Sequence, residues 1–364
     1  GGQAAAMATD RERWFAKNKH LPAPDSYTIQ AVAALSPTDT SVDGKRAELE
    51  NVYYLTLHGA QDADLNHFYG ASQYSRTSFP VRSERFKASL YIAHANHVHF
   101  NTAWGDYDSS LPKGLFLNLR HLITAEDQRQ IAKVYVSAFF ATALRGQSQY
   151  IPLFRDYRTG RAYLPDTRYY NQFQSGRFSA IARFDDETNS FKRADGITSI
   201  AHNIKEKIRV KRGGGKVLKW RRAGSYTLKS NEGFLQKNSS YLSFTMANRG
   251  ADEESKSNHK SSQVNVDIEL TDQTGRSIKF PLERYHPVKP VPQPQYTWSC
   301  VFEKHISDGK YTEPEDPVFQ TYEIPLDDLQ TADSDFSLSE WTQLTFHFRD
   351  EPGKVIFKNI GIVR

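Results

Sequence analysis

Two short segments of the chain carry the acid and base residue types that acyl transfer requires. Residues 57–65 read Leu-His-Gly-Ala-Gln-Asp-Ala-Asp-Leu, so Asp62 follows an apolar run and a glycine that permits a sharp turn. Residues 94–101 read His-Ala-Asn-His-Val-His-Phe-Asn and place His97 just after another apolar run. A histidine held by a carboxylate can take a proton from a hydroxyl nucleophile and return it to the leaving group.

The elements that would position these residues are three apolar runs and two helices. The runs 29–35, 52–58 and 87–93 predict buried strands, and residues 66–77 predict a helix. A second helix is predicted from a cap at Thr124 to about residue 145, because apolar residues there recur at helical spacing.

This alternation of strands and helices predicts a parallel sheet with crossover helices. Asp62 and His97 then follow successive strands at the carboxyl edge, where sites form in open α/β sheets. An acid after one strand and a histidine after the next is also the order found in α/β-hydrolases.

Here the chain resembles a known family. Residues 59–62 and 95–101 resemble the acid loop and histidine loop of bacterial α/β-hydrolases of the dienelactone-hydrolase and polyester-esterase type. The resemblance covers about residues 1–150 and implies that Asp62 is the acid and His97 the base of a Ser-His-Asp triad acting on carboxylic esters without a cofactor. Residues 1–18 predict an opening helix, and the start of this helix resembles the segment after a Gly-x-Ser-x-Gly nucleophile motif, with Gly1 as its last glycine. The resemblance therefore implies a serine and an oxyanion donor upstream of this chain.

The sequence contains no Gly-x-Ser-x-Gly motif of its own. The nearest match, around Ser148, lacks the second glycine and follows a predicted helix rather than a strand. We therefore expect this chain to be inactive on esters alone and to need a missing N-terminal hydrolase segment as its partner.

Other roles for the same residues remain open. Asp64 is an alternative acid and His99 an alternative base, whereas His94 is expected to be structural. Together with Asp62 and His97, these side chains are also ligand types that suit zinc, so a metallohydrolase is a second hypothesis. Because no further Asp/His cluster completes such a site, the main prediction contains no metal.

The remainder of the chain has a different pattern. After about residue 175 short alternating runs are separated by Gly, Asn, Asp and Pro, as at 241–246, 264–270 and 343–348, which predicts an all-β, jelly-roll-like sandwich. We expect a hydrolase portion at 1–165, a linker at 166–190 and a β-sandwich accessory domain at 191–364.

The sandwich suggests an alternative function, a non-catalytic carbohydrate-binding protein with a hydrolase remnant. Trp220, Tyr241, Trp298 and Trp341 could stack on sugar rings, although most are expected in the core. A basic stretch at 205–222 favours a solvated hairpin over a polyanion site, so no nucleic acid is expected.

Composition limits the other possibilities. The 364 residues carry a net charge of +5 and are 38% hydrophobic, enough for a packed core. The single cysteine, Cys300, excludes an intramolecular disulfide, and no apolar run reaches the roughly 18 residues of a membrane helix. The sequence leaves the cellular compartment open.

Overall fold

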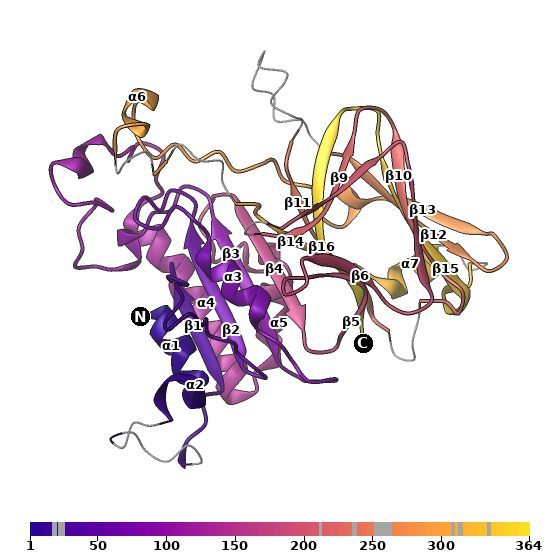
Figure 1. Ribbon diagram of the computed structural model, residues 1–364, viewed down its shortest axis with the longest axis horizontal. Coiled ribbons are helices and arrows are strands. Elements are labelled where there is room, and N and C mark those ends of the chain that lie inside the picture. The colour runs from indigo at the N-terminus through magenta and orange to yellow at the C-terminus, as the bar shows by residue number, and fades with distance from the viewer. Residues whose placement is uncertain are drawn as a thin grey trace. The chain divides into compact units, whose positions relative to one another are not determined.

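The computed structural model divides the chain into two units (Figure 1). Unit 1 comprises Gly1–Gly176 and Pro292–Asp316, and unit 2 comprises Arg177–Val291 and Pro317–Arg364. Unit 1 is therefore discontinuous in sequence, because residues 292–316, expected in the sandwich domain, belong to it. The structure describes residues 1–16, 20, 26–210, 213–234, 239–250, 264–306, 310–311, 316–332 and 336–364.

Unit 1 is built on a four-stranded sheet in the order β1-β2-β3-β4. Its strands are β1 (Ala31–Leu35), β2 (Tyr53–Gly59), β3 (Phe86–Ile92) and β4 (Tyr169–Ser175). The first three are parallel, which confirms the predicted α/β sheet, whereas β4 is antiparallel to β3. This fourth strand lies in the expected linker, where buried Asn171 and Gln172 interrupt any apolar pattern.

The long helix α4 (Ala125–Arg145) covers this sheet where the sequence places it. Thr124 caps its first turn by accepting the backbone N–H of Asp127, and Gly146 ends it with a φ of +67°. Its buried side chains pack against β2 and β3 in one apolar cluster.

The remaining helices are short. The predicted opening helix is two helices, α1 (Gly2–Thr9) and α2 (Arg11–Phe15), which meet at Asp10. The other α-helices in the described ranges are α3 (Tyr69–Arg76), α5 (Ile151–Arg155), α6 (Cys300–Glu303) and α7 (Leu326–Ala332).

Unit 2 is an antiparallel β-sandwich, as predicted. One sheet has the order β13-β12-β15-β10-β7, and the other follows β14-β11-β16-β5-β6, with β9 pairing to β16 and β8 to β9. The strands are β5 (Phe178–Asp185), β6 (Ser190–Arg193), β7 (Ile197–His202), β8 (Lys205–Arg209), β9 (Gly215–Trp220), β10 (Gly224–Ser230), β11 (Tyr241–Asn248), β12 (Val266–Asp272), β13 (Ser277–Pro281), β14 (Gln320–Pro325), β15 (Trp341–Phe348) and β16 (Gly353–Val363).

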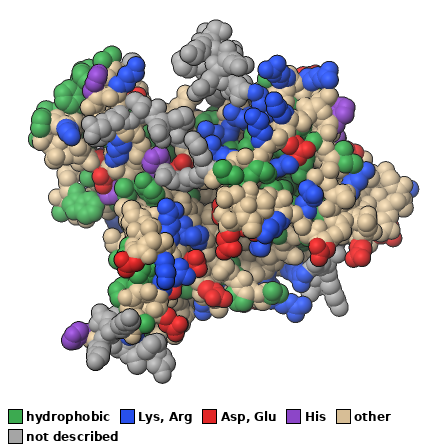
Figure 2. Space-filling view, viewed as in Figure 1, with side chains coloured by type: hydrophobic (Ala, Val, Ile, Leu, Met, Phe, Trp, Pro, Cys, Tyr) green, Lys and Arg blue, Asp and Glu red, His purple; other side chains and the backbone are tan. Residues whose placement is uncertain are grey.

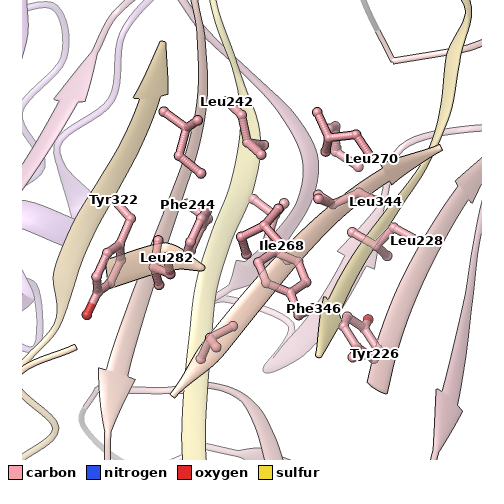
Figure 3. Packing of buried hydrophobic residues seen from close by; sticks show 14 of the residues in the cluster. Tyr226, Leu228, Leu242, Phe244, Ile268, Leu270, Leu282, Tyr322, Leu344 and Phe346 are labelled. Atoms are coloured by element: carbon pink, nitrogen blue, oxygen red, sulfur yellow. The ribbon is translucent and has the colours of Figure 1, made fainter. Parts of the chain in front are cut away.

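The core of unit 2 lies between these two sheets (Figure 3). Phe244 from one sheet and Phe346 from the other meet edge to face with ring centroids 5.1 Å apart. Ile268 and Leu344 extend the same cluster and are fully buried. Burying each such side chain stabilises the fold by about 1.5–3 kcal/mol, so inward-facing alternation determines the register of the strands.

No helix in the described part of the chain is long and apolar enough to cross a lipid bilayer.

Candidate functional site

The candidate site lies where β2 and β3 of unit 1 end. The acid loop (residues 59–65) follows β2, and the base loop (residues 94–101) follows β3. Gly59 packs directly on the backbone of Ala95, where a Cβ would clash with the carbonyl group. The backbone N–H of Gln61 also donates to the Ala95 carbonyl at 2.8 Å. Backbone contacts alone therefore hold the two loops against each other.

The structure brings Asp62 and His97 together. The distance from His97 Nδ1 to Asp62 Oδ2 is 2.9 Å, and Asp62 is completely buried. The other carboxylate oxygen accepts the backbone N–H of Leu65 at 2.6 Å. Because a carboxylate only accepts, Nδ1 carries the hydrogen in this pair, and the neutral imidazole keeps its lone pair on Nε2. The catalytic roles of the two residues remain predictions.

The charges around His97 favour its protonated form. Burial opposes that form, but the hydrogen bond and charge of Asp62, with smaller contributions from Asp64 and Asp108, raise the pKa of His97. The pKa of the neighbouring His58 is lowered instead, because burial outweighs the adjacent Asp62 charge. The Asp62 carboxylate can therefore stabilise one positive charge, and the directions of the two pKa shifts place that charge on His97 rather than on His58.

A third carboxylate, Asp108, binds the backbone of both loops. It accepts N–H groups from Ala63 at 2.8 Å, from His97 at 3.0 Å and from Val98 at 2.9 Å. Burial, and then repulsion from Asp62, raise the pKa of Asp108 to about 6 although these N–H groups oppose the shift. Sequence reasoning missed Asp108, because the spacing of Asp106 and Asp108 in their loop does not indicate a contact with the Asp62 and His97 loops.

Contacts from distant segments also fix the two loops. On α4, the Gln128 side chain accepts the backbone N–H of Asn96 at 3.0 Å and donates to its carbonyl at 2.8 Å. Lys310 Nζ and the Tyr311 hydroxyl each donate to the Ala63 carbonyl at 2.7 Å. Residues 292–316 therefore help to shape the acid loop, although more than 200 residues separate them from it.

The other residues considered from the sequence lie nearby but are arranged differently. Asp64 Oδ2 is 3.8 Å from His97 Nε2, and its side chain is 56% exposed. His99 Nε2 lies 3.5 Å from Asp106, and His94 has a positive φ of +60° at the turn after β3. Among the described residues, no three His, Cys, Asp or Glu side chains come together as metal ligands. The metallohydrolase hypothesis therefore has no ligand set in this part of the chain.

An aromatic and apolar surface borders the dyad. The Trp104 ring is stacked on the His97 ring, with centroids 5.9 Å apart and planes within 6°, and Trp104 is 59% exposed. Residues 104–111 line a hollow of about 390 Å³. Figure 2 shows apolar side chains gathered around α6 and the adjacent loop. The exposed apolar residues of these segments are Leu111, Leu115, Trp298 and Val301.

In unit 2, the aromatic residues considered for sugar stacking are mostly in the core. Trp220 and Trp341 are buried, and Tyr241 is half-buried at the start of β11. Trp298 is exposed but belongs to unit 1. Stacking on Trp220 or Trp341 is therefore excluded by their burial.

The outer face of the five-stranded sheet is polar instead. Its side chains alternate with the core residues along each strand. They form hydrogen bonds with one another, between Thr227 and Thr345 at 3.0 Å and between His347 and Glu269 at 2.7 Å. We call this surface the polar face. Its central members are Ser225, Thr227, Lys229, Asp267, Glu269, Thr271, Gln343, Thr345 and His347.

The basic stretch forms the hairpin of β8 and β9. Lys216 is paired there with Glu206, so part of the positive charge of the basic stretch is neutralised. Lys211 and Arg212, counted in the same stretch, lie outside the described residues. Its described part agrees with the expectation of a solvated hairpin.

No family model and no curated protein matches the chain. Solved structures that match its C-terminal half include a family 29 carbohydrate-binding module complexed with mannohexaose, at 14% identity and a TM-score of 0.30, covering 51% of this chain and 92% of that one. A family 11 carbohydrate-binding module of a Clostridium thermocellum cellulosomal cellulase matches at 12% identity and a TM-score of 0.29, covering 51% and 94%. The extra C-terminal domain of an exo-1,3/1,4-beta-glucanase from a Pseudoalteromonas species matches at 10% identity and a TM-score of 0.27, covering 51% and 92%. These TM-scores are too low to support a functional conclusion.

Proposed function

We propose that unit 1 supplies the acid and base of a serine hydrolase that acts on carboxylic esters. The observation that supports this proposal is the 2.9 Å contact between His97 Nδ1 and the buried Asp62 carboxylate. Among the described residues, His97 Nε2 makes no hydrogen bond, and Asp64 lies 3.8 Å from it. That nitrogen is therefore available to a hydroxyl group.

The proposed mechanism assigns one role to each residue. His97 Nε2 takes the proton of a serine hydroxyl as the oxygen attacks the ester carbonyl, and it then returns the proton to the leaving alcohol. Asp62 fixes the tautomer and stabilises the imidazolium that forms. Water then attacks the acyl-enzyme. His97 Nε2 takes a proton from the water and returns it to the serine oxygen, and the acid is released.

No serine hydroxyl forms a hydrogen bond with His97 in the described ranges. We propose that the nucleophilic serine comes from an upstream segment, as the resemblance of the opening of the chain to a post-nucleophile segment implies. The exposed Trp104 ring beside His97 offers an apolar face to an ester substrate.

The test is hydrolysis of p-nitrophenyl esters by the chain alone and by the chain mixed with the encoded upstream segment. We expect activity only in the mixture, reduced about 10³-fold or more in His97→Ala and Asp62→Asn. His121→Ala is the matched control, because His121 is an exposed histidine of the same unit outside the two loops. An active mixture that His97→Ala leaves unchanged would contradict the proposal.

A second candidate function is polysaccharide binding by unit 2. The observation that favours it is the polar face, where donors and acceptors project from a rigid sheet at strand spacing. Such side chains can form hydrogen bonds with sugar hydroxyls. Gln343 and Thr271, which are register partners on neighbouring strands, are an example.

Retention of the full chain on a panel of insoluble polysaccharides tests this candidate. Binding that Gln343→Ala weakens and that the exposed control Lys192→Ala does not would support the polar face as the site. If no polysaccharide in the panel retains the chain, or if both variants bind equally, the polar face has no such role.

A further inference from the structure

Asp108 connects the two loops that hold the proposed acid and base. Its Oδ2 accepts the N–H of Ala63 in the acid loop, its Oδ1 accepts the N–H of Val98 in the base loop, and the two oxygens share the N–H of His97, at 3.0 Å for Oδ1 and 3.1 Å for Oδ2. Ala63 directly follows the acid, and His97 is the base itself. A single side chain thus fixes the backbone at both members of the dyad.

Only a carboxylate at position 108 accepts all three of these N–H groups. Each carboxylate oxygen accepts hydrogen bonds, so one side chain satisfies donors on two separate loops. An amide has one accepting oxygen, and its NH₂ group would face an N–H donor on the other side. Asparagine at this position therefore leaves at least one of the three N–H groups facing its own NH₂ group.

We propose that Asp108 is a positioning residue that keeps the Asp62 carboxylate and the His97 ring in hydrogen-bonding register by bridging their loops. The inference rests on the roles proposed above for Asp62 and His97. The titratable groups whose charges interact with Asp108 are Asp62, His97 and Tyr311. Keeping a third carboxylate close to Asp62 is electrostatically unfavourable, which is consistent with a positional requirement.

Backbone amide exchange in the full chain measures the bridge directly. In Asp108→Asn we expect exchange about tenfold faster or more at Ala63 or at Val98, whichever amide faces the NH₂ group, and in Asp108→Ala at Ala63, His97 and Val98. Asp166→Asn removes an equally negative, exposed carboxylate of unit 1 and should change neither site. The amide of Leu90 in β3 reports whether the sheet remains folded. Exchange within twofold of wild type at all three amides of Asp108→Ala would overturn the proposal.

A second readout separates positioning from general stability. The downfield proton resonance of His97 Nδ1–H should broaden or shift in Asp108→Asn, while Leu90 keeps its protection. In the active mixture, kcat should fall at least tenfold with KM nearly unchanged, because the base is misplaced rather than the substrate. An unchanged kcat in Asp108→Ala would also overturn the proposal. A mixture that is inactive with wild-type chain would refute the proposed ester hydrolysis instead, while the amide exchange still tests the bridge.

Discussion

Replacing Asp108 by asparagine should change how the stability of unit 1 depends on pH. The pKa of Asp108 is raised from 3.8 to about 6 in the folded chain, so the folded state binds a proton more tightly than the unfolded state does. The contribution of this group to stability is therefore fully present below about pH 4. It is lost as the pH rises through 6.

The size of the effect can be worked out from the shift. A shift from 3.8 to about 6 corresponds to about 3 kcal/mol at 1.36 kcal/mol per pH unit, which is an upper bound. Asparagine stays neutral at every pH and does not incur this loss, but it leaves at least one loop N–H without its acceptor. We therefore expect the variant to gain stability relative to wild type between pH 4 and pH 7, by up to about 3 kcal/mol.

Hydrogen exchange of buried β2 and β3 amides in urea measures this difference for unit 1 alone. The free energy of unfolding of Asp108→Asn minus that of wild type should rise from pH 4 to pH 7 and then level off. Asp166→Asn provides the baseline, since Asp166 is exposed. A difference that stays flat over this range would refute the reasoning, because it would show that Asp108 is not destabilised by its charge.

Three further changes have defined outcomes. Asp62→Asn should lower the pKa of His97, because it removes the charge that opposes the effect of burial; an NMR titration of the imidazole would show it, and an unchanged pKa would contradict the dyad. Gly59→Ala should destabilise unit 1 by about 1–3 kcal/mol through its clash with the Ala95 carbonyl, a cost that urea unfolding measures and that a neutral result would exclude. Phe346→Ala should cost unit 2 about 3–5 kcal/mol, seen as a lower denaturation midpoint; a loss below about 1 kcal/mol would mean that the core collapses around the cavity.

The elements that were predicted correctly are those whose signals are local. The helix at 125–145 has a cap at Thr124, apolar residues at helical spacing and a terminal Gly146, so three independent signals agree. The parallel strands β2 and β3 are buried on both faces and appear as continuous apolar runs, whereas β1 at the edge of the sheet is buried on one face. The sandwich is indicated by its alternation and its turn residues.

The features that the sequence could not indicate depend on contacts between distant residues. Strand β4 has a mixed pattern, because Asn171 is buried and donates to the Arg155 carbonyl at 2.8 Å. Asp108 lies in a loop, and its importance appears only when the Ala63 and His97 amides converge on it. The order of the strands predicts that Asp62 and His97 lie close together. It does not predict the Asp108 contacts that hold their loops.

The discontinuity of unit 1 has a consequence for biosynthesis. The Ala63 carbonyl receives its donors from Lys310 and Tyr311, which are 247 and 248 residues further along the chain. At 5–20 residues per second a ribosome makes them roughly 12–50 s after Ala63, when strands β5 to β13 have already been synthesised. The acid loop therefore completes its contacts late, although still before β15 and β16, which occupy the interior of the two sandwich sheets, have been synthesised. A shortened gene ending at Gly176 would encode Asp62 and His97 but not the donors that complete their loop.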